Sequence, residues 1–115
     1  MERNIRIVMI EDDEIIREGY ALLIGQVEGY SVVKSYASFD DAAKTIMDDL
    51  PDVILLDIEL PGTNGIAAIP KLKKMLPGVH ILILTVYESE KQIFEALANG
   101  ASGYLTKNTQ PAKII

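Results

Sequence analysis

The stretch Val53-Ile54-Leu55-Leu56-Asp57-Ile58-Glu59-Leu60-Pro61-Gly62 decides how the rest of the chain is interpreted. Four consecutive apolar residues lead directly to one carboxylate, and a Pro-Gly turn follows soon after. An unbroken apolar run is typical of a strand buried on both faces in a parallel sheet. Ligands bind beyond the carboxyl ends of such strands, so Asp57 is a candidate for chemistry. The alternative is an ordinary acid that caps a helix or starts a turn.

The composition indicates one α/β domain. The chain has 115 residues, of which 49% are hydrophobic and only 6% aromatic, as expected for an aliphatic core. It has no cysteine, which excludes disulfides and thiolate metal sites. A net charge of −6 argues against direct nucleic-acid binding by this segment. The N-terminal residues resemble neither a signal peptide nor a membrane span, so we expect a cytoplasmic protein without a membrane partner.

Apolar runs and helical periodicities alternate along the whole sequence. The expected strands cover residues 5–10, 31–36, 53–57, 79–84 and 101–106. The expected helices cover 14–27, 38 to before Pro51, 63–75 and 89–98, with a last helix from Thr109. Such alternation implies right-handed crossovers and a parallel sheet with helices on both faces.

Chemically useful side chains follow four of the five expected strands. They are Glu11, Asp12 and Asp13, then Asp57, Thr85 and Lys107. If these strands are neighbours, the groups meet at one edge of the sheet. Carboxylates brought together must hold protons or bind a hard cation. Because no His or Cys is nearby, the expected cation is Mg²⁺, bound by oxygen ligands. An ionised Asp57 could then attack phosphorus, with a lysine and a threonine to bind the phosphoryl oxygens.

The same residues carry a resemblance to the receiver domains of two-component response regulators. The matching segments are Ile10-Glu11-Asp12-Asp13 with Arg17, Leu56 to Gly65, Leu84-Thr85, and Gly100 to Lys107. The resemblance covers essentially the whole chain. The last segment and Thr85-Val86-Tyr87 are most similar to receivers of the NarL/FixJ subfamily, which precede a LuxR-type helix-turn-helix DNA-binding domain.

The resemblance implies a flavodoxin-like α/β/α fold with five parallel strands in the order 2-1-3-4-5. Residues 1–115 would form the receiver, truncated within its last helix, and a DNA-binding output domain would follow. A sensor histidine kinase would phosphorylate Asp57, so the domain would be a signalling phosphoprotein and not an enzyme in its own right. A homodimer on phosphorylation is a further expectation, and DNA would be bound only through the output domain.

The resemblance also assigns roles to individual residues. Asp12, Asp57 and the backbone carbonyl of Glu59 would hold Mg²⁺, with Glu11 acting through water. Lys107 and Thr85 would bind the phosphoryl group, and Thr85 with Tyr104 would form the switch pair.

Some details depend on register and on departures from the usual family pattern. Arg17 lies five positions after Asp12 and favours Glu11 and Asp12 as the acidic pair over Asp12 and Asp13. Asn108 replaces the proline that often follows the lysine, which leaves a cis peptide there in doubt. Val86 is bulkier than the usual small residue, and Glu59 and Tyr87 occupy positions that tune hydrolysis of the acyl phosphate.

Two other functions compete with a phosphorylated receiver. A haloacid-dehalogenase-like phosphatase also uses Asp, Mg²⁺, Thr and Lys, but here Glu59 stands where that class has its acid-base Asp. The other alternative is a receiver-like scaffold that never takes phosphate. The complete set of acids, Thr and Lys argues against it.

Overall fold

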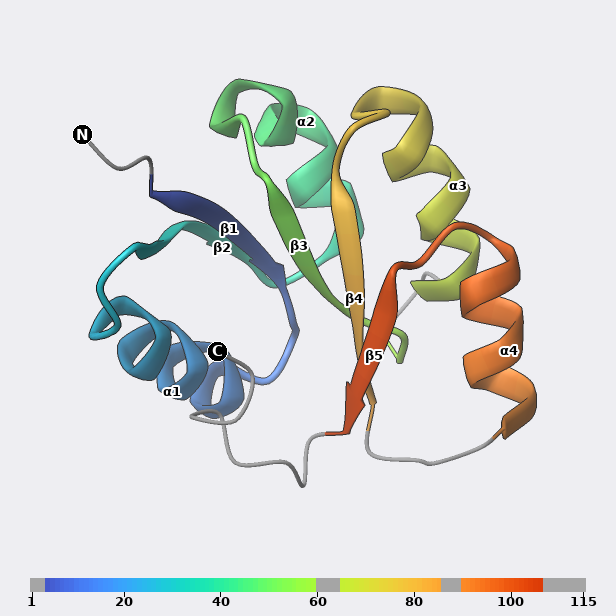
Figure 1. Ribbon diagram of the computed structural model, residues 1–115, viewed down its shortest axis with the longest axis horizontal. Coiled ribbons are helices and arrows are strands. Elements are labelled where there is room, and N and C mark those ends of the chain that lie inside the picture. The colour runs from blue at the N-terminus through green and yellow to red at the C-terminus, as the bar shows by residue number, and fades with distance from the viewer. Residues whose placement is uncertain (1–3, 60–64, 86–89, 107–115) are drawn as a thin grey trace.

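A five-stranded parallel sheet forms the centre of the protein. The computed structural model describes residues 4–59, 65–85 and 90–106. The strands have the order β2-β1-β3-β4-β5, which confirms the predicted α/β topology (Figure 1). In chain order the elements are β1 Ile5–Ile10, α1 Glu14–Gly25, β2 Tyr30–Tyr36, α2 Phe39–Asp49, β3 Val53–Asp57, α3 Gly65–Met75, β4 His80–Thr85, α4 Glu90–Ala98 and β5 Gly103–Thr106.

Alternate residues of the strands β1 to β4 supply two separate cores, one on each face of the sheet. In β1, Val8 and Ile10 belong to the core that also contains buried residues of α2, α3 and α4. Ile7 and Met9 pack instead with buried residues of α1. Because both faces are covered, the residues of β1 from Ile7 to Ile10 are all apolar, and Arg6 is the one interruption of the predicted apolar run.

Several element ends differ by one or two residues from the prediction. The first helix ends at Gly25, not at Val27. Here the Val27 N–H donates to the carbonyl of Ile24, which turns the chain towards Gly29 at a φ of 92°. Gly100 has a φ of 114°, which confirms the predicted left-handed cap of α4. Strand β5 then begins at Gly103 and not at Ala101.

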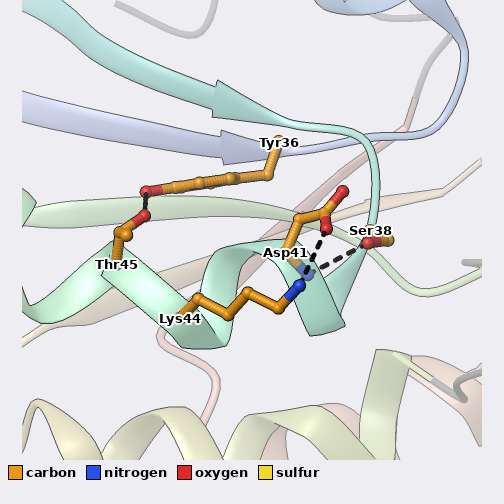
Figure 2. A network of polar contacts seen from close by, with 5 residues as sticks. All are labelled: Tyr36, Ser38, Asp41, Lys44 and Thr45. Atoms are coloured by element: carbon orange, nitrogen blue, oxygen red, sulfur yellow. Dashed lines mark hydrogen bonds and ion pairs between the residues drawn. The ribbon is translucent and has the colours of Figure 1, made fainter.

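Ser38 caps the N-terminal end of α2, at the position where the sequence predicted that this helix opens. Its hydroxyl oxygen accepts the N–H of Asp41 at 3.1 Å. Figure 2 shows this contact beside the exposed pair of Asp41 and Lys44, at 3.9 Å. In the same view, the Tyr36 hydroxyl at the end of β2 meets the hydroxyl of Thr45 at 2.7 Å. The start of α2 is therefore capped locally, and a residue further along the helix ties α2 to β2.

The C-terminal end of α2 has an unusual residue. Leu50 has a φ of 51°, a left-handed conformation that normally favours glycine, and its side chain is 67% exposed. The guanidinium of Arg6 donates to the carbonyl of Asp49 at 2.7 Å through Nη2 and to that of Leu50 at 3.2 Å through Nε. These contacts satisfy carbonyls that the end of the helix leaves unpaired, and the helix stops before Pro51 as predicted.

Strand β2 contains one extra residue relative to β1. Ile7 pairs with Val32, whereas Val8 pairs with Lys34, so Val33 forms a bulge between them. The third helix continues through Pro70. No helix in the described part of the chain is both long and apolar enough to cross a membrane. The predictions for Thr63, Ser89 and the helix from Thr109 lie outside the described residues.

Candidate functional site

Three carboxylates meet at the carboxyl edge of the sheet. Glu11 and Asp12 directly follow β1, Asp57 is the last residue of β3, and these two strands are paired side by side. One oxygen atom from each of the three side chains lies within 4.8 Å of the others. Glu11 and Asp57 are buried, at 0% and 1% exposure, and Asp12 is exposed. The cluster therefore combines two desolvated acids with one that reaches solvent.

Backbone groups hold Glu11 at both ends. Its N–H donates to the carbonyl of Tyr36 at 2.9 Å, and its Oε2 atom accepts the N–H of Asp13 at 3.0 Å. Strand β2 contributes no carboxylate to the acid cluster of the described residues, but its last residue supplies this carbonyl. The sequence carried no signal for a contact made by the backbone alone.

Asp13 caps the first helix. Its Oδ1 atom accepts the N–H groups of Ile15 at 2.9 Å and of Ile16 at 3.2 Å, which is the usual task of an N-cap carboxylate. The grouping of Glu11 and Asp12 with Asp57 supports the acidic pair that the position of Arg17 favoured. The cap was detectable in the sequence, since Asp13 directly precedes the first periodic residues of the helix.

The turn after Asp57 is fixed by short-range and long-range contacts. Oδ1 of Asp57 accepts the N–H of Glu59 at 2.9 Å. The N–H of Ile58 donates to the carbonyl of Leu84 at 3.3 Å, and the N–H of Gly65 donates to the carbonyl of Ile58 at 3.1 Å. These bonds orient the carboxylate at the end of its strand.

Gly65 lies directly against this turn. A Cβ atom built on it would lie 2.3 Å from Cα of Ile58 and 2.6 Å from the carbonyl oxygen of Asp57. Both neighbours are backbone atoms, so any side chain at this position must displace the turn that carries Asp57. Sequence reasoning placed Gly65 at the start of a helix but did not detect this close approach.

The donor set fits a hard divalent cation. Three carboxylates this close repel one another, and the repulsion is strongest for buried groups. Oxygen ligands from Asp and Glu are those that Mg²⁺ prefers in proteins. Glu11, Asp12 and Asp57 could therefore hold such an ion between β1 and β3.

The other predicted site residues are only partly described. Thr85 is the last residue of β4, and in the sheet Asp57 pairs with its neighbour Leu84, so the Thr85 backbone lies at the same edge. Tyr104 lies in β5 opposite Ile83, and its side chain is 46% exposed. Lys107, Asn108, Val86 and Tyr87 lie outside the described residues. The roles of these residues stay predictions.

A groove of about 380 Å³ lies at the opposite edge of the sheet. It is lined by Leu50 to Asp52, which precede β3, and by Met75 to Val79, which precede β4. Because these turns are at the amino ends of the strands, the groove has no part in the acid cluster.

The family profile described as "Response regulator receiver domain" matches residues 7–115. The chain belongs to this family. The match favours a receiver over the phosphatase alternative, since the fold, the strand order and the acid cluster all belong to one family pattern. Its similarity to response regulators of the LuxR family and to a NarL receiver domain shows that it is a receiver of the NarL/LuxR type.

Similar proteins show how far the likeness extends. The oxygen regulatory protein NreC of Staphylococcus haemolyticus is 33% identical over 111 residues, which are 96% of this chain and 51% of that protein. The chain thus spans about half the length of the curated relatives it matches. A LuxR-family response regulator from Aurantimonas sp. SI85-9A1 is 35% identical, with a TM-score of 0.89 over 96% of this chain and 79% of that one.

A third relative was solved in a phosphorylated state. This response regulator from Burkholderia pseudomallei carries a phosphorylated aspartic acid, a calcium ion and citrate. It is 28% identical to this receiver, with a TM-score of 0.86 over 95% of this chain and 63% of that one.

Proposed function

We propose that this receiver is a phosphoacceptor and that Asp57 takes a phosphoryl group from a sensor histidine kinase. The observation that carries the proposal is the grouping of buried Asp57 with Glu11 and Asp12, within 4.8 Å, at the carboxyl edge of the sheet. The Burkholderia relative, whose structure contains a phosphorylated aspartic acid and a calcium ion, supports the same chemistry.

In the proposed reaction, a carboxylate oxygen of Asp57 forms a bond to phosphorus. The bond from phosphorus to the kinase histidine breaks, and its electron pair returns to the imidazole. The N–H of Glu59, bonded to Oδ1 at 2.9 Å, orients the carboxylate for this attack. A bound Mg²⁺ would supply positive charge for the phosphoryl oxygens. We assign it to Glu11, Asp12, Asp57 and the backbone carbonyl of Glu59, with Glu11 acting through water.

Thr85 and Lys107 complete the proposed site. The Thr85 hydroxyl and the Lys107 ammonium would donate to the phosphoryl oxygens, since each added phosphoryl group brings three acceptors. Thr85 would move towards the phosphoryl group, and Tyr104 would turn inward behind it. The exposure of Tyr104, at 46%, is consistent with a starting position from which such a movement is possible.

The proposed output is a changed surface on α4 and β5. The relatives are about twice as long as this chain, and LuxR-family members are among the similar structures. We therefore propose that a DNA-binding output domain follows the receiver, that DNA is bound only there, and that phosphorylation favours a homodimer. The proposed setting is the cytoplasm.

Intact-mass measurement after incubation with acetyl phosphate tests the phosphoacceptor. We expect one phosphoryl adduct that depends on Mg²⁺, that hydroxylamine removes as it does acyl phosphates, and that is absent in Asp57→Asn. An adduct that persists in Asp57→Asn would place the phosphoryl group elsewhere. If no adduct forms with acetyl phosphate or with a phosphorylated kinase, the protein is a phosphate-independent scaffold.

A further inference from the structure

Arg17 occupies a position that is unfavourable for a cation in an isolated helix. It is the fourth residue of α1, whose N-terminal end carries the positive end of the helix dipole. Its side chain turns back to the preceding loop, where Nη1 donates to the carbonyl of Glu11 at 2.8 Å and, at a longer 3.5 Å, to that of Asp12. The contacts with this loop explain why an arginine stands there.

These contacts connect to the other bonds of the loop. Asp13 bonds the first turn of α1 through its side chain, and its carbonyl accepts the N–H of Arg17 at 2.9 Å. The N–H of Asp13 in turn donates to the side chain of Glu11 at 3.0 Å. Arg17 thus donates to the carbonyls of the two peptide groups that flank Asp12, while the first turn of α1 holds Asp13.

The consequence is geometric. The direction of a side chain follows from the backbone angles of its residue, and the carbonyls of Glu11 and Asp12 belong to the two peptide planes that flank Asp12. Holding both planes fixes the direction in which the Cα–Cβ bond of Asp12 leaves the loop, and so limits where its exposed carboxylate can lie. Without this restraint, more of the order of the loop backbone around Asp12 would have to be gained at the moment of cation binding.

We propose that Arg17 is a positioning residue that prepares Glu11 and Asp12 for a divalent cation by fixing the loop between β1 and α1. The inference rests on the proposed function, because it concerns the same cation. It assigns Arg17 no contact with the ion or with the phosphoryl group.

A role of Arg17 through its charge and a role through positioning predict opposite changes in Mg²⁺ affinity when the residue is replaced, which makes the proposal testable. If Arg17 acted only as a positive charge near the cation, its removal would tighten Mg²⁺ binding by Coulomb's law. If it acts by positioning, Arg17→Gln and Arg17→Lys both weaken binding, since lysine keeps the charge but is shorter and lacks the rigid guanidinium that places Nη1 at both carbonyls. We expect the Mg²⁺ Kd to rise about 10-fold in both, as for residues that orient metal ligands.

Arg6 offers a matched control within the same protein. Its guanidinium also donates to backbone carbonyls, those of Asp49 and Leu50, but at the end of α2. Arg6→Lys therefore makes the same chemical change away from the acid cluster. We expect it to lower thermal stability and to leave the Mg²⁺ Kd unchanged.

The measurement is isothermal titration of Mg²⁺ into each folded variant, with acetyl phosphate kinetics as a second readout. For Arg17→Lys we expect slower phosphorylation at low Mg²⁺ and the wild-type rate at saturating Mg²⁺. An unchanged Kd in Arg17→Lys, or tighter binding in Arg17→Gln, would overturn the inference while the proposed function stands. If the wild-type protein binds no Mg²⁺, the metal part of the proposed function fails and the inference fails with it. Amide hydrogen exchange at Asp13, faster in Arg17→Lys than in Arg6→Lys, would confirm that the loop itself has loosened.

Discussion

The backbone carbonyl of Tyr36 accepts the N–H of Glu11 at 2.9 Å, so the last residue of β2 holds the first acid that follows β1. The hydroxyl of the same tyrosine contacts the hydroxyl of Thr45 in α2 (Figure 2). It also donates a hydrogen bond to the carboxylate of Asp49, the last residue of α2. One buried residue thus connects the acid cluster to the far end of a helix.

Tyr36 makes stability sensitive to alkaline pH. Burial, with the hydrogen bond to Asp49 as the next cause, raises the pKa of Tyr36 above its ordinary 10.0, and the bond to Thr45 opposes this. The folded protein then keeps the hydroxyl proton at a pH where the unfolded chain has lost it. The contribution to stability is full below pH 10.0 and is lost as the pH rises through the folded-state pKa.

Tyr36→Phe should therefore remove part of the alkaline loss of stability. At neutral pH we expect the variant to lose about 1 kcal/mol from the missing hydrogen bonds. The difference from wild type should shrink above pH 10. Urea unfolding at several pH values measures both, with Tyr104→Phe as a control that alters an exposed tyrosine. A gap that stays constant from neutral to alkaline pH would contradict the assignment.

Gly65→Ala should damage the site as well as the fold. The added methyl group meets the backbone of Ile58 and Asp57 at distances that no relaxed structure contains. We expect a loss of about 1–3 kcal/mol in the free energy of unfolding. We also expect weaker Mg²⁺ binding, since the turn that carries Asp57 must move. Urea denaturation and isothermal titration are the measurements.

Gly19→Ala is the matched control for this substitution. Gly19 lies within α1, and nothing lies within 4 Å of the position where its Cβ would stand. Alanine there should increase stability by about 1 kcal/mol through helix propensity. Equal effects of the two substitutions would show that the close approach at Gly65 has no energetic weight.

Leu50→Gly should stabilise the protein. A leucine in the left-handed region is strained by roughly 1–2 kcal/mol, and glycine removes this at a smaller cost in chain entropy. We expect a net gain of about 0.5–1 kcal/mol in thermal or urea unfolding. Leu22→Gly, a change to another exposed leucine but inside α1, should instead lose about 1 kcal/mol. A loss of stability at both positions would mean that Leu50 is not strained.

Asp12→Asn should have two distinct effects on stability, one from reduced repulsion within the acid cluster and one from weaker cation binding. Without Mg²⁺ the variant should be more stable than wild type, since one of three neighbouring negative charges is gone. Mg²⁺ at about 100 times its Kd should add about 2.7 kcal/mol to wild type, and much less to the variant at that concentration. Thermal unfolding with and without Mg²⁺ measures both. Glu28→Gln, which removes an exposed charge in a turn, should respond to Mg²⁺ as wild type does.

The sequence predicted best what depends on local pattern. The run from Ile5 to Ile10, broken only by Arg6, became a strand with the expected bounds, because its apolar residues from Ile7 onward are buried between two covered faces. The sequence has acids directly after β1 and β3, which predicted that they lie close together, because the carboxyl ends of neighbouring parallel strands are at the same edge of the sheet. The strand order came from the family resemblance, since the pattern of the chain does not determine which strands are neighbours.

The sequence did not predict contacts made by the backbone between distant segments. The carbonyl of Tyr36, the fit of Gly65 against Ile58 and the grip of Arg17 on the acidic loop depend on how strand ends are placed to within an ångström. Residue types alone carry little of that information, because any residue could supply a carbonyl. Helix and strand ends were off by one or two residues for the same reason, since turns such as that at Val27 are selected by tertiary packing.

The bulge at Val33 bears on how the protein behaves when it is concentrated. Strand β2 is one free margin of the sheet, and an intact, flat margin can recruit a strand from another molecule and begin aggregation. The extra residue interrupts the regular ladder there, and the next residue is an exposed lysine, Lys34. This margin is therefore a poor template for strand addition, which protects the fold against edge-to-edge association of sheets.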